Sequence, residues 1–157
     1  MNVLYPAQIT FDKGDNRFFV QFLDIPEAIT EGESEDEAFF NASEVLTLAI
    51  EGRLEEGMEV PQPSKCTGQQ KFISPSVRAQ ASLLIRWAKL SGDHTTSEIA
   101  RSLNTSWPAV SRLEDPKHWP SLRQLEKIAN VLGQQLIISM EPLPRTNGIR
   151  TNGVRVD

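Results

Sequence analysis

The chain has 157 residues, of which 39% are hydrophobic and 24% are charged, and it carries a formal net charge of −5. This composition excludes a disordered chain, and because the apolar runs are far shorter than ~20 residues and no signal-like N-terminus is present, the protein is expected to be cytoplasmic and to bind no membrane. The single cysteine, Cys66, excludes an internal disulfide and a thiolate cluster for zinc.

The first domain, residues 1–60, is predicted to contain strands followed by one helix. Ser34 and Glu37 fit a capping box, and apolar residues keep helical spacing from there until Gly57. This order of elements indicates an α+β fold. Alternating apolar residues and intervening turn residues predict three strands before the helix, at residues 3–11, 17–23 and 28–30.

Residues 61–75 are predicted to be a linker, because prolines and a glycine are spaced among polar residues without apolar periodicity. The second domain, residues 76–141, is predicted to be helical with a terminal strand at Gln135–Met140. Residues 142–157, which contain a near-repeat rich in polar residues and glycine, are predicted to form a disordered tail.

Four helices are predicted in the second domain from apolar spacing, capping boxes and glycine stops. Thr95 with Glu98 and Ser121 with Gln124 form the two capping boxes, and Asn104 suits a left-handed turn. The four helices span Val77 to about Gly92, Thr95 to Leu103, Ser106 to Leu113 and Ser121 to Gly133. The apolar face of the first of these helices is predicted at Val77, Ala81, Leu84 and Ala88.

The charge is divided unevenly between the two halves. Residues 1–63 hold 14 acidic and 3 basic residues, a balance of −11, whereas residues 64–157 hold 7 acidic and 13 basic residues, a balance of +6. The basic half is therefore expected to meet a polyanion. The acidic half either meets a basic partner or only keeps the protein soluble.

Two short helices joined by the turn at residues 104–106 match the helix-turn-helix requirement for binding double-stranded DNA. Ser106, at a helix N-terminus, would hold a phosphate, and Arg112 would reach a guanine or the backbone. In the alternative, Trp107 is merely packed and Arg112 merely solvated. The predicted DNA-contact residues are Thr96, Ser106, Trp107, Pro108, Ser111, Arg112 and Lys117, and Arg123 and Lys127 are further candidates for backbone contacts.

Residues 95–114 resemble the Cro/CI-type (Xre) helix-turn-helix, in a pattern carried by Thr95, Ile99-Ala100, Leu103, Ser106 and Val110 to Glu114. The segment departs from that family at Thr96, where glutamine is frequent, and at Trp107 and Pro108, where polar side chains usually read the bases. The resemblance implies the fold of a DNA-binding unit and leaves the operator sequence open.

Residues 1–64 resemble the HicB antitoxin family in an ordered set of segments, Tyr5-Pro6-Ala7, Phe19 to Phe22, Asp24-Ile25-Pro26, Ala28 to Gly32, the helix from Ser34, and Glu55 to Ser64. The resemblance implies a partial RNase H-like fold and a small basic HicA-type toxin that cleaves mRNA. It also implies repression of the shared operon. The −11 domain is complementary in charge to a protein that binds RNA. The predicted toxin contacts are Tyr5, Phe19, Gln21, Asp24 and Glu27.

The predicted terminal strand has no sequential partner strand in its own domain, so it is expected to pair with its symmetry mate. The resulting homodimer, alone or paired into a tetramer, would present two helices ~34 Å apart to a palindromic operator. The residues assigned to this dimer contact are Leu136, Ile137, Ile138 and Met140.

The sequence therefore predicts a non-enzymatic antitoxin that also represses its own operon, and no cofactor or metal is expected. Two other functions stay open. A metal-dependent nuclease would hold divalent cations with Asp12, Asp15, Asp24 and Glu27. Against it, Asp12 and Asp15 fit a hairpin turn, where acidic residues are common, and the first domain is short for a nuclease sheet. A ligand-sensing repressor would bind a small molecule in the first domain.

Overall fold

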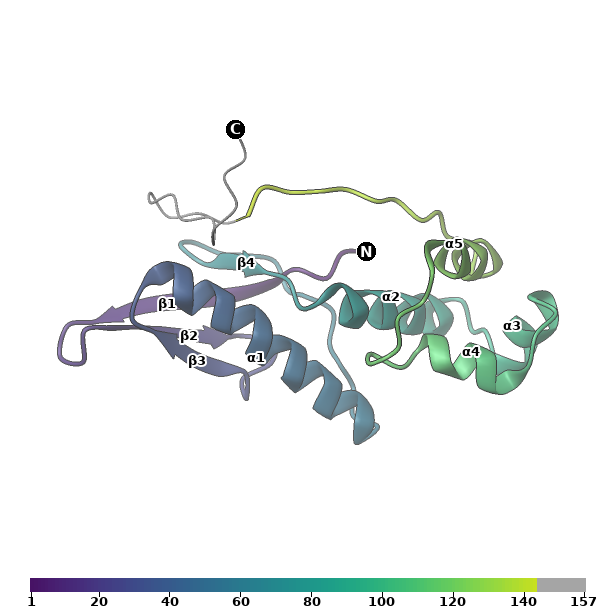
Figure 1. Ribbon diagram of the computed structural model, residues 1–157, viewed down its shortest axis with the longest axis horizontal. Coiled ribbons are helices and arrows are strands. Elements are labelled where there is room, and N and C mark those ends of the chain that lie inside the picture. The colour runs from purple at the N-terminus through teal and green to yellow at the C-terminus, as the bar shows by residue number, and fades with distance from the viewer. Residues whose placement is uncertain (144–157) are drawn as a thin grey trace.

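The computed structural model describes residues 1–143, so residues 144–157 of the predicted tail lie outside the described part (Figure 1). A four-stranded sheet covered by one long helix makes the first half, and four helices make the second. No helix in this part of the chain is long and apolar enough to cross a membrane. The elements are β1 (Tyr5–Asp12), β2 (Arg17–Phe22), β3 (Ile29–Gly32), α1 (Glu35–Glu55), β4 (Lys71–Ile73), α2 (Val77–Ser91), α3 (Thr96–Ser102), α4 (Trp107–Leu113) and α5 (Leu122–Val131).

The sheet has the order β3-β2-β1-β4, and each neighbouring pair is antiparallel. Ala7 lies opposite Phe22, and Ile9 lies opposite Val20, so these four side chains share the face that packs on α1. The three predicted strands are confirmed, with bounds that differ from the prediction by one or two residues. The other face of the sheet carries Gln8, Thr10, Phe19, Gln21 and Ile29.

Helix α1 begins where the sequence predicts. The Ser34 hydroxyl accepts a hydrogen bond from the Glu37 amide at 3.1 Å. The second half of the predicted capping box is different, because the Glu37 carboxylate accepts from the Glu33 amide instead. A side chain at Gly32 would collide with the backbone of Ala38, so glycine lets β3 pass directly beneath the start of α1.

The predicted linker is only partly a linker. Residues 71–73 form β4, which pairs with Tyr5–Ala7 of β1. Upstream, Val60 is buried, and the Tyr5 hydroxyl donates to the Pro61 carbonyl oxygen at 2.7 Å. Three residues are too few to show the alternation of apolar and polar side chains that predicts a strand. These residues form a strand because they pair with the open edge of β1.

Helix α2 belongs to two hydrophobic cores. Its buried residues Ala79, Leu83 and Trp87 pack into the core of the sheet and α1, whereas Ile85 and Ala88 pack into the core of α3, α4 and α5. The helix forms where the apolar spacing of Val77, Ala81, Leu84 and Ala88 predicts it, but these residues do not form one buried face: Val77 is 68% exposed, and Ala81 and Leu84 are only partly buried. A helix between two cores buries residues on two sides, so its burial does not follow one stripe.

The helical unit forms largely as the local signals predict. Both capping boxes are present, at Thr95 with Glu98 and at Ser121 with Gln124. Asn104 adopts φ 51°, the left-handed turn conformation that reverses the chain between α3 and α4. The buried side chains of this core are Ile85, Ala88, Ile99, Ala100, Val110, Leu113, Ile128 and Leu132.

The predicted terminal strand is not formed within the single chain. Residues 134–143 contain no helix or strand, and the apolar side chains of Ile137, Ile138 and Met140 are 78%, 66% and 96% exposed. A strand needs a hydrogen-bonding partner, and none of the described strands lies beside this segment.

Candidate nucleic-acid and partner interfaces

Helix α4 presents most of the predicted DNA-contact residues at the surface. Ser106, Pro108 and Arg112 are exposed, Trp107 is 56% exposed, and Ser111 is half-buried. The Ser106 hydroxyl caps α4 itself, accepting from the Ala109 amide at 3.3 Å. The inward residues of α4, Val110 and Leu113, are buried, so the helix is anchored on one side and open on the other.

Lys89 of α2 holds both short helices in place. Its ammonium group donates to a Glu114 carboxylate oxygen at 2.6 Å and to the Thr96 hydroxyl at 3.2 Å. The side chains of Lys89 and Glu114 are 18% and 14% exposed. Removal of either partner would leave the other charge unpaired and largely shielded from solvent, which destabilises the fold strongly. Thr96 was predicted to contact DNA, and this stays a prediction; in the structure its hydroxyl accepts a hydrogen bond from Lys89.

A hollow of about 500 Å³ lies between the open side of α4 and the C-terminal end of α1. Trp107 and Ser111 line one side, and Leu54 and Glu55 line another. Arg86 of α2 also lines it, with no ion-pair partner among the described residues. The sequence reasoning missed Arg86, since nothing local shows that α2 and α4 lie side by side.

Lys117 connects the two halves of the protein. Its ammonium group donates to the Glu55 carboxylate of α1, and this hydrogen bond raises the pKa of Lys117. Lys117 was predicted to contact DNA, and this stays a prediction; in the structure its ammonium group is paired with Glu55 of α1. The sequence does not show this pairing, because 62 positions separate the two residues.

Arg78 of α2 strengthens the same connection. Its guanidinium donates to the Lys117 carbonyl oxygen at 3.3 Å and lies 5.1 Å from the centre of the Trp119 ring. On its other side, Nη2 is 3.8 Å from an oxygen of the Glu51 carboxylate. Helix α1, helix α2 and the loop after α4 are therefore held together by one set of contacts.

The residues predicted to contact a toxin differ in their availability. Tyr5 is fully buried, which raises the pKa of its hydroxyl, so its predicted surface role is corrected: strand alternation turns it into the core. The Glu27 carboxylate pairs with the Arg53 guanidinium, whose hydrogen bond lowers the pKa of Glu27. Asp24 accepts from the Ser64 amide at 3.0 Å. Phe19 and Gln21 lie on the face of the sheet away from α1.

Three of the four carboxylates considered for a nuclease, those of Asp12, Asp24 and Glu27, are engaged separately. Asp12 accepts from the amides of Gly14 and Asp15 in the predicted hairpin turn, while Asp24 and Glu27 make the contacts given above. Within residues 1–143, no three side chains of histidine, cysteine, aspartate or glutamate gather in a way that could hold a metal ion.

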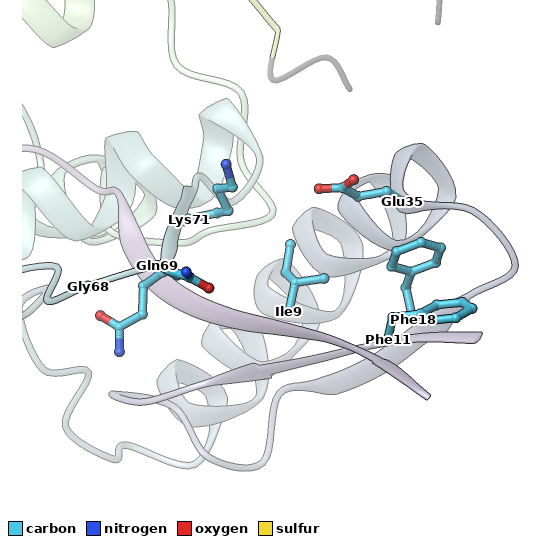
Figure 2. A pocket seen from close by; sticks show the side chains of 8 residues that line it. Ile9, Phe11, Phe18, Glu35, Gly68, Gln69 and Lys71 are labelled. Carbon is cyan, nitrogen blue, oxygen red and sulfur yellow. The ribbon is translucent and has the colours of Figure 1, made fainter. Parts of the chain in front are cut away.

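A second hollow, of about 420 Å³, lies between the hairpin end of the sheet and the start of α1 (Figure 2). The rings of Phe11 and Phe18 lie beside each other with centroids 4.8 Å apart, and Glu35 lies above them on α1.

The fold and its surfaces define a protein of two cores, one in an acidic sheet-and-helix domain and one in a basic helical unit, joined through α2. Residues 4–81 match the family model described as a HicB-like antitoxin of a bacterial toxin-antitoxin system. The matched span includes β4 and the first residues of α2.

Similarity to curated proteins extends beyond that domain. Antitoxin HicB 1 of Photorhabdus laumondii subsp. laumondii is 29% identical over 140 residues, which cover 89% of this chain and 88% of that protein. Antitoxin HicB of Escherichia coli is 29% identical over 136 residues, which cover 87% of this chain and 98% of that protein. This similarity supports an antitoxin function for the chain.

Proposed function

We propose that this chain is the antitoxin of a type II toxin-antitoxin system that also represses its own operon. Its acidic N-terminal domain binds a small basic HicA-like toxin that cleaves mRNA, and its C-terminal unit binds palindromic operator DNA. The observation that carries the proposal is the presence, on one chain, of a HicB-like domain over residues 4–81 and an exposed α4 in a basic helical unit.

On the DNA side, α4 acts as the recognition helix of a helix-turn-helix formed with α3. Arg112 is exposed and has no ion-pair partner among the described residues, so it can reach a base edge or a phosphate. Trp107 offers a large exposed ring for a sugar or a thymine methyl group. Ser106, Pro108 and Ser111 complete the proposed contact, and Arg86 is added as a backbone contact.

The toxin contact is tested by producing this chain together with the small basic protein encoded in the neighbouring reading frame. We expect the two proteins to elute as one complex, and the basic protein to be toxic when produced alone. If the chain is instead a ligand-sensing repressor, it should purify without a protein partner. Failure of the two proteins to co-elute would therefore contradict the proposal.

The dimer contact is assigned to the exposed segment after α5. Leu136, Ile137, Ile138 and Met140 are proposed to form a strand with the same segment of a second copy, because single exposed strands gain hydrogen bonds by such pairing. Deletion of residues 134–157 should convert a dimer into a monomer in analytical ultracentrifugation, with the helical content of the remaining chain preserved. A truncated chain that still sediments as a dimer would place the contact elsewhere.

A further inference from the structure

Two large apolar side chains stand exposed on α1. Phe40 and Leu48 are 66% and 65% exposed, and they are eight residues apart with Glu44 midway between them. Residues spaced by four lie above one another on a helix, so these three form one stripe, here called the outer face of α1. The residues that α1 buries in the core lie on its other side: Ala38, Phe39, Ala42, Leu46 and Ile50.

Phe40, Glu44 and Leu48 are exposed, so no described residue covers this part of the outer face, whereas further along α1 the side chain of Arg78 meets Glu51, which is buried. Figure 1 shows α1 lying over the sheet, with no other helix or strand crossing in front of it. Exposed apolar side chains gathered on one element, rather than scattered singly, are typical of a surface that a partner covers. The outer face therefore has the character of a docking surface.

Gly52 extends the same stripe by one further step of four residues. A β-carbon at this position would meet no atom within 4 Å, so no contact inside the chain requires glycine there. Its φ lies outside the left-handed range, so alanine would adopt the same backbone more favourably. Glycine inside a helix permits the close approach of another backbone, and the structure offers no internal reason for this one.

The charge around the stripe favours a basic occupant. Two of the three basic residues in positions 1–63 are already neutralised, Arg17 by Glu31 and Arg53 by Glu27. Glu44, at the centre of the stripe, is exposed, and its carboxylate makes no hydrogen bond or ion pair within residues 1–143. A cationic protein would therefore find unpaired negative charge beside apolar surface.

We propose that the basic toxin docks on the outer face of α1, with Phe40 and Leu48 as the apolar anchors, Glu44 as a charge contact and Gly52 as the point of closest approach. This inference rests on the proposed function. It shifts the centre of the contact from the sheet, where Phe19 and Gln21 were predicted to bind, to the helix on the opposite side.

The decisive variant is Gly52→Gln, measured in the complex with the basic protein from the neighbouring reading frame. Glutamine is a better helix former than glycine and its β-carbon meets nothing, so the midpoint of thermal unfolding of the free chain should stay equal or rise. Its side chain should nevertheless block the partner and weaken binding by about tenfold or more in calorimetry. A variant that only damaged the fold would show the opposite change in stability.

The double variant Phe40→Ala with Leu48→Ala should also bind about tenfold or more weakly, because exposed apolar anchors contribute to a partner contact and little to the fold. The matched comparison is Phe19→Ala with Gln21→Ala on the sheet, and Val77→Ala, 68% exposed on α2, controls for loss of an exposed apolar group. Unchanged binding of both α1 variants would overturn the docking site, whatever the sheet variants do. Failure of the wild-type chain to bind the basic protein would instead contradict the proposed function itself.

Discussion

Replacement of Trp87 by alanine is expected to lower the free energy of unfolding by about 3–5 kcal/mol, the usual cost of removing a large buried aromatic side chain. Trp87 is only 6% exposed, and its indole nitrogen donates to the Val60 carbonyl oxygen at 3.1 Å. The alanine variant loses this apolar burial and also leaves the Val60 carbonyl without its donor. Since single domains are stable by only about 5–15 kcal/mol, the change removes a large share of the total.

The position of Trp87 on α2 adds a second expectation. Because α2 contributes to both cores, urea should unfold the wild-type chain and the Trp87→Ala variant in one transition that near-ultraviolet and far-ultraviolet circular dichroism follow together. Trp107→Ala is the matched control: this tryptophan is 56% exposed and its loss should change stability by no more than about 0.5 kcal/mol. Two separate transitions in the wild type would show that α2 does not couple the cores.

Replacement of Arg112 by alanine is expected to weaken binding to the chain's own promoter by about tenfold or more, the effect of losing one guanidinium contact worth about 1–3 kcal/mol. Arg112 is exposed on α4 and supports no other part of the described structure, so the fold should be unaffected. Fluorescence anisotropy with promoter and scrambled duplexes measures both the affinity and the specificity.

The dependence of this DNA binding on salt concentration distinguishes a phosphate contact of Arg112 from a base contact. Wild-type affinity should fall steeply as salt rises, because neutralised phosphates release counterions. If Arg112 binds a phosphate, the alanine variant should have a salt slope shallower by about one, and if it binds a base the slope should be unchanged. Lys13→Ala, which removes a positive charge from the acidic domain, is the control and should bind like the wild type. An Arg112 variant with wild-type affinity would remove this residue from the site.

Features decided by neighbouring residues were predictable. The caps at Ser34, Thr95 and Ser121 each depend on a residue three positions further on, and the turn at Asn104 depends on one residue's tolerance of a positive φ. Three strands, α1 and the four later helices follow from the same short-range patterns. The family resemblance over the first domain likewise rests on short segments in a defined order, and the match over residues 4–81 agrees with it.

Features decided by distant residues were not predictable. Strand β4 exists because the edge of β1 is open to it, and its three residues have no periodicity of their own. The contact of Lys89 with Thr96 and that of Lys117 with Glu55 could not be predicted, since charge in a sequence does not show which partner it meets. Tyr5 was assigned to the surface from its position in a motif, and packing placed it in the core.

The amino-acid sequence by itself determined three strands, the helices and the division into an acidic and a basic half, because capping, local hydrogen bonding and charge are properties of single residues and close neighbours. Only the tertiary structure decided how the halves are joined. Helix α2 lies between two cores, and Arg78 and Lys117 connect it and the loop after α4 to α1, so the two halves are joined by a packed connection in addition to the predicted linker. The physical reason is that burial and ion pairing between residues far apart in the chain depend on where the backbone brings them.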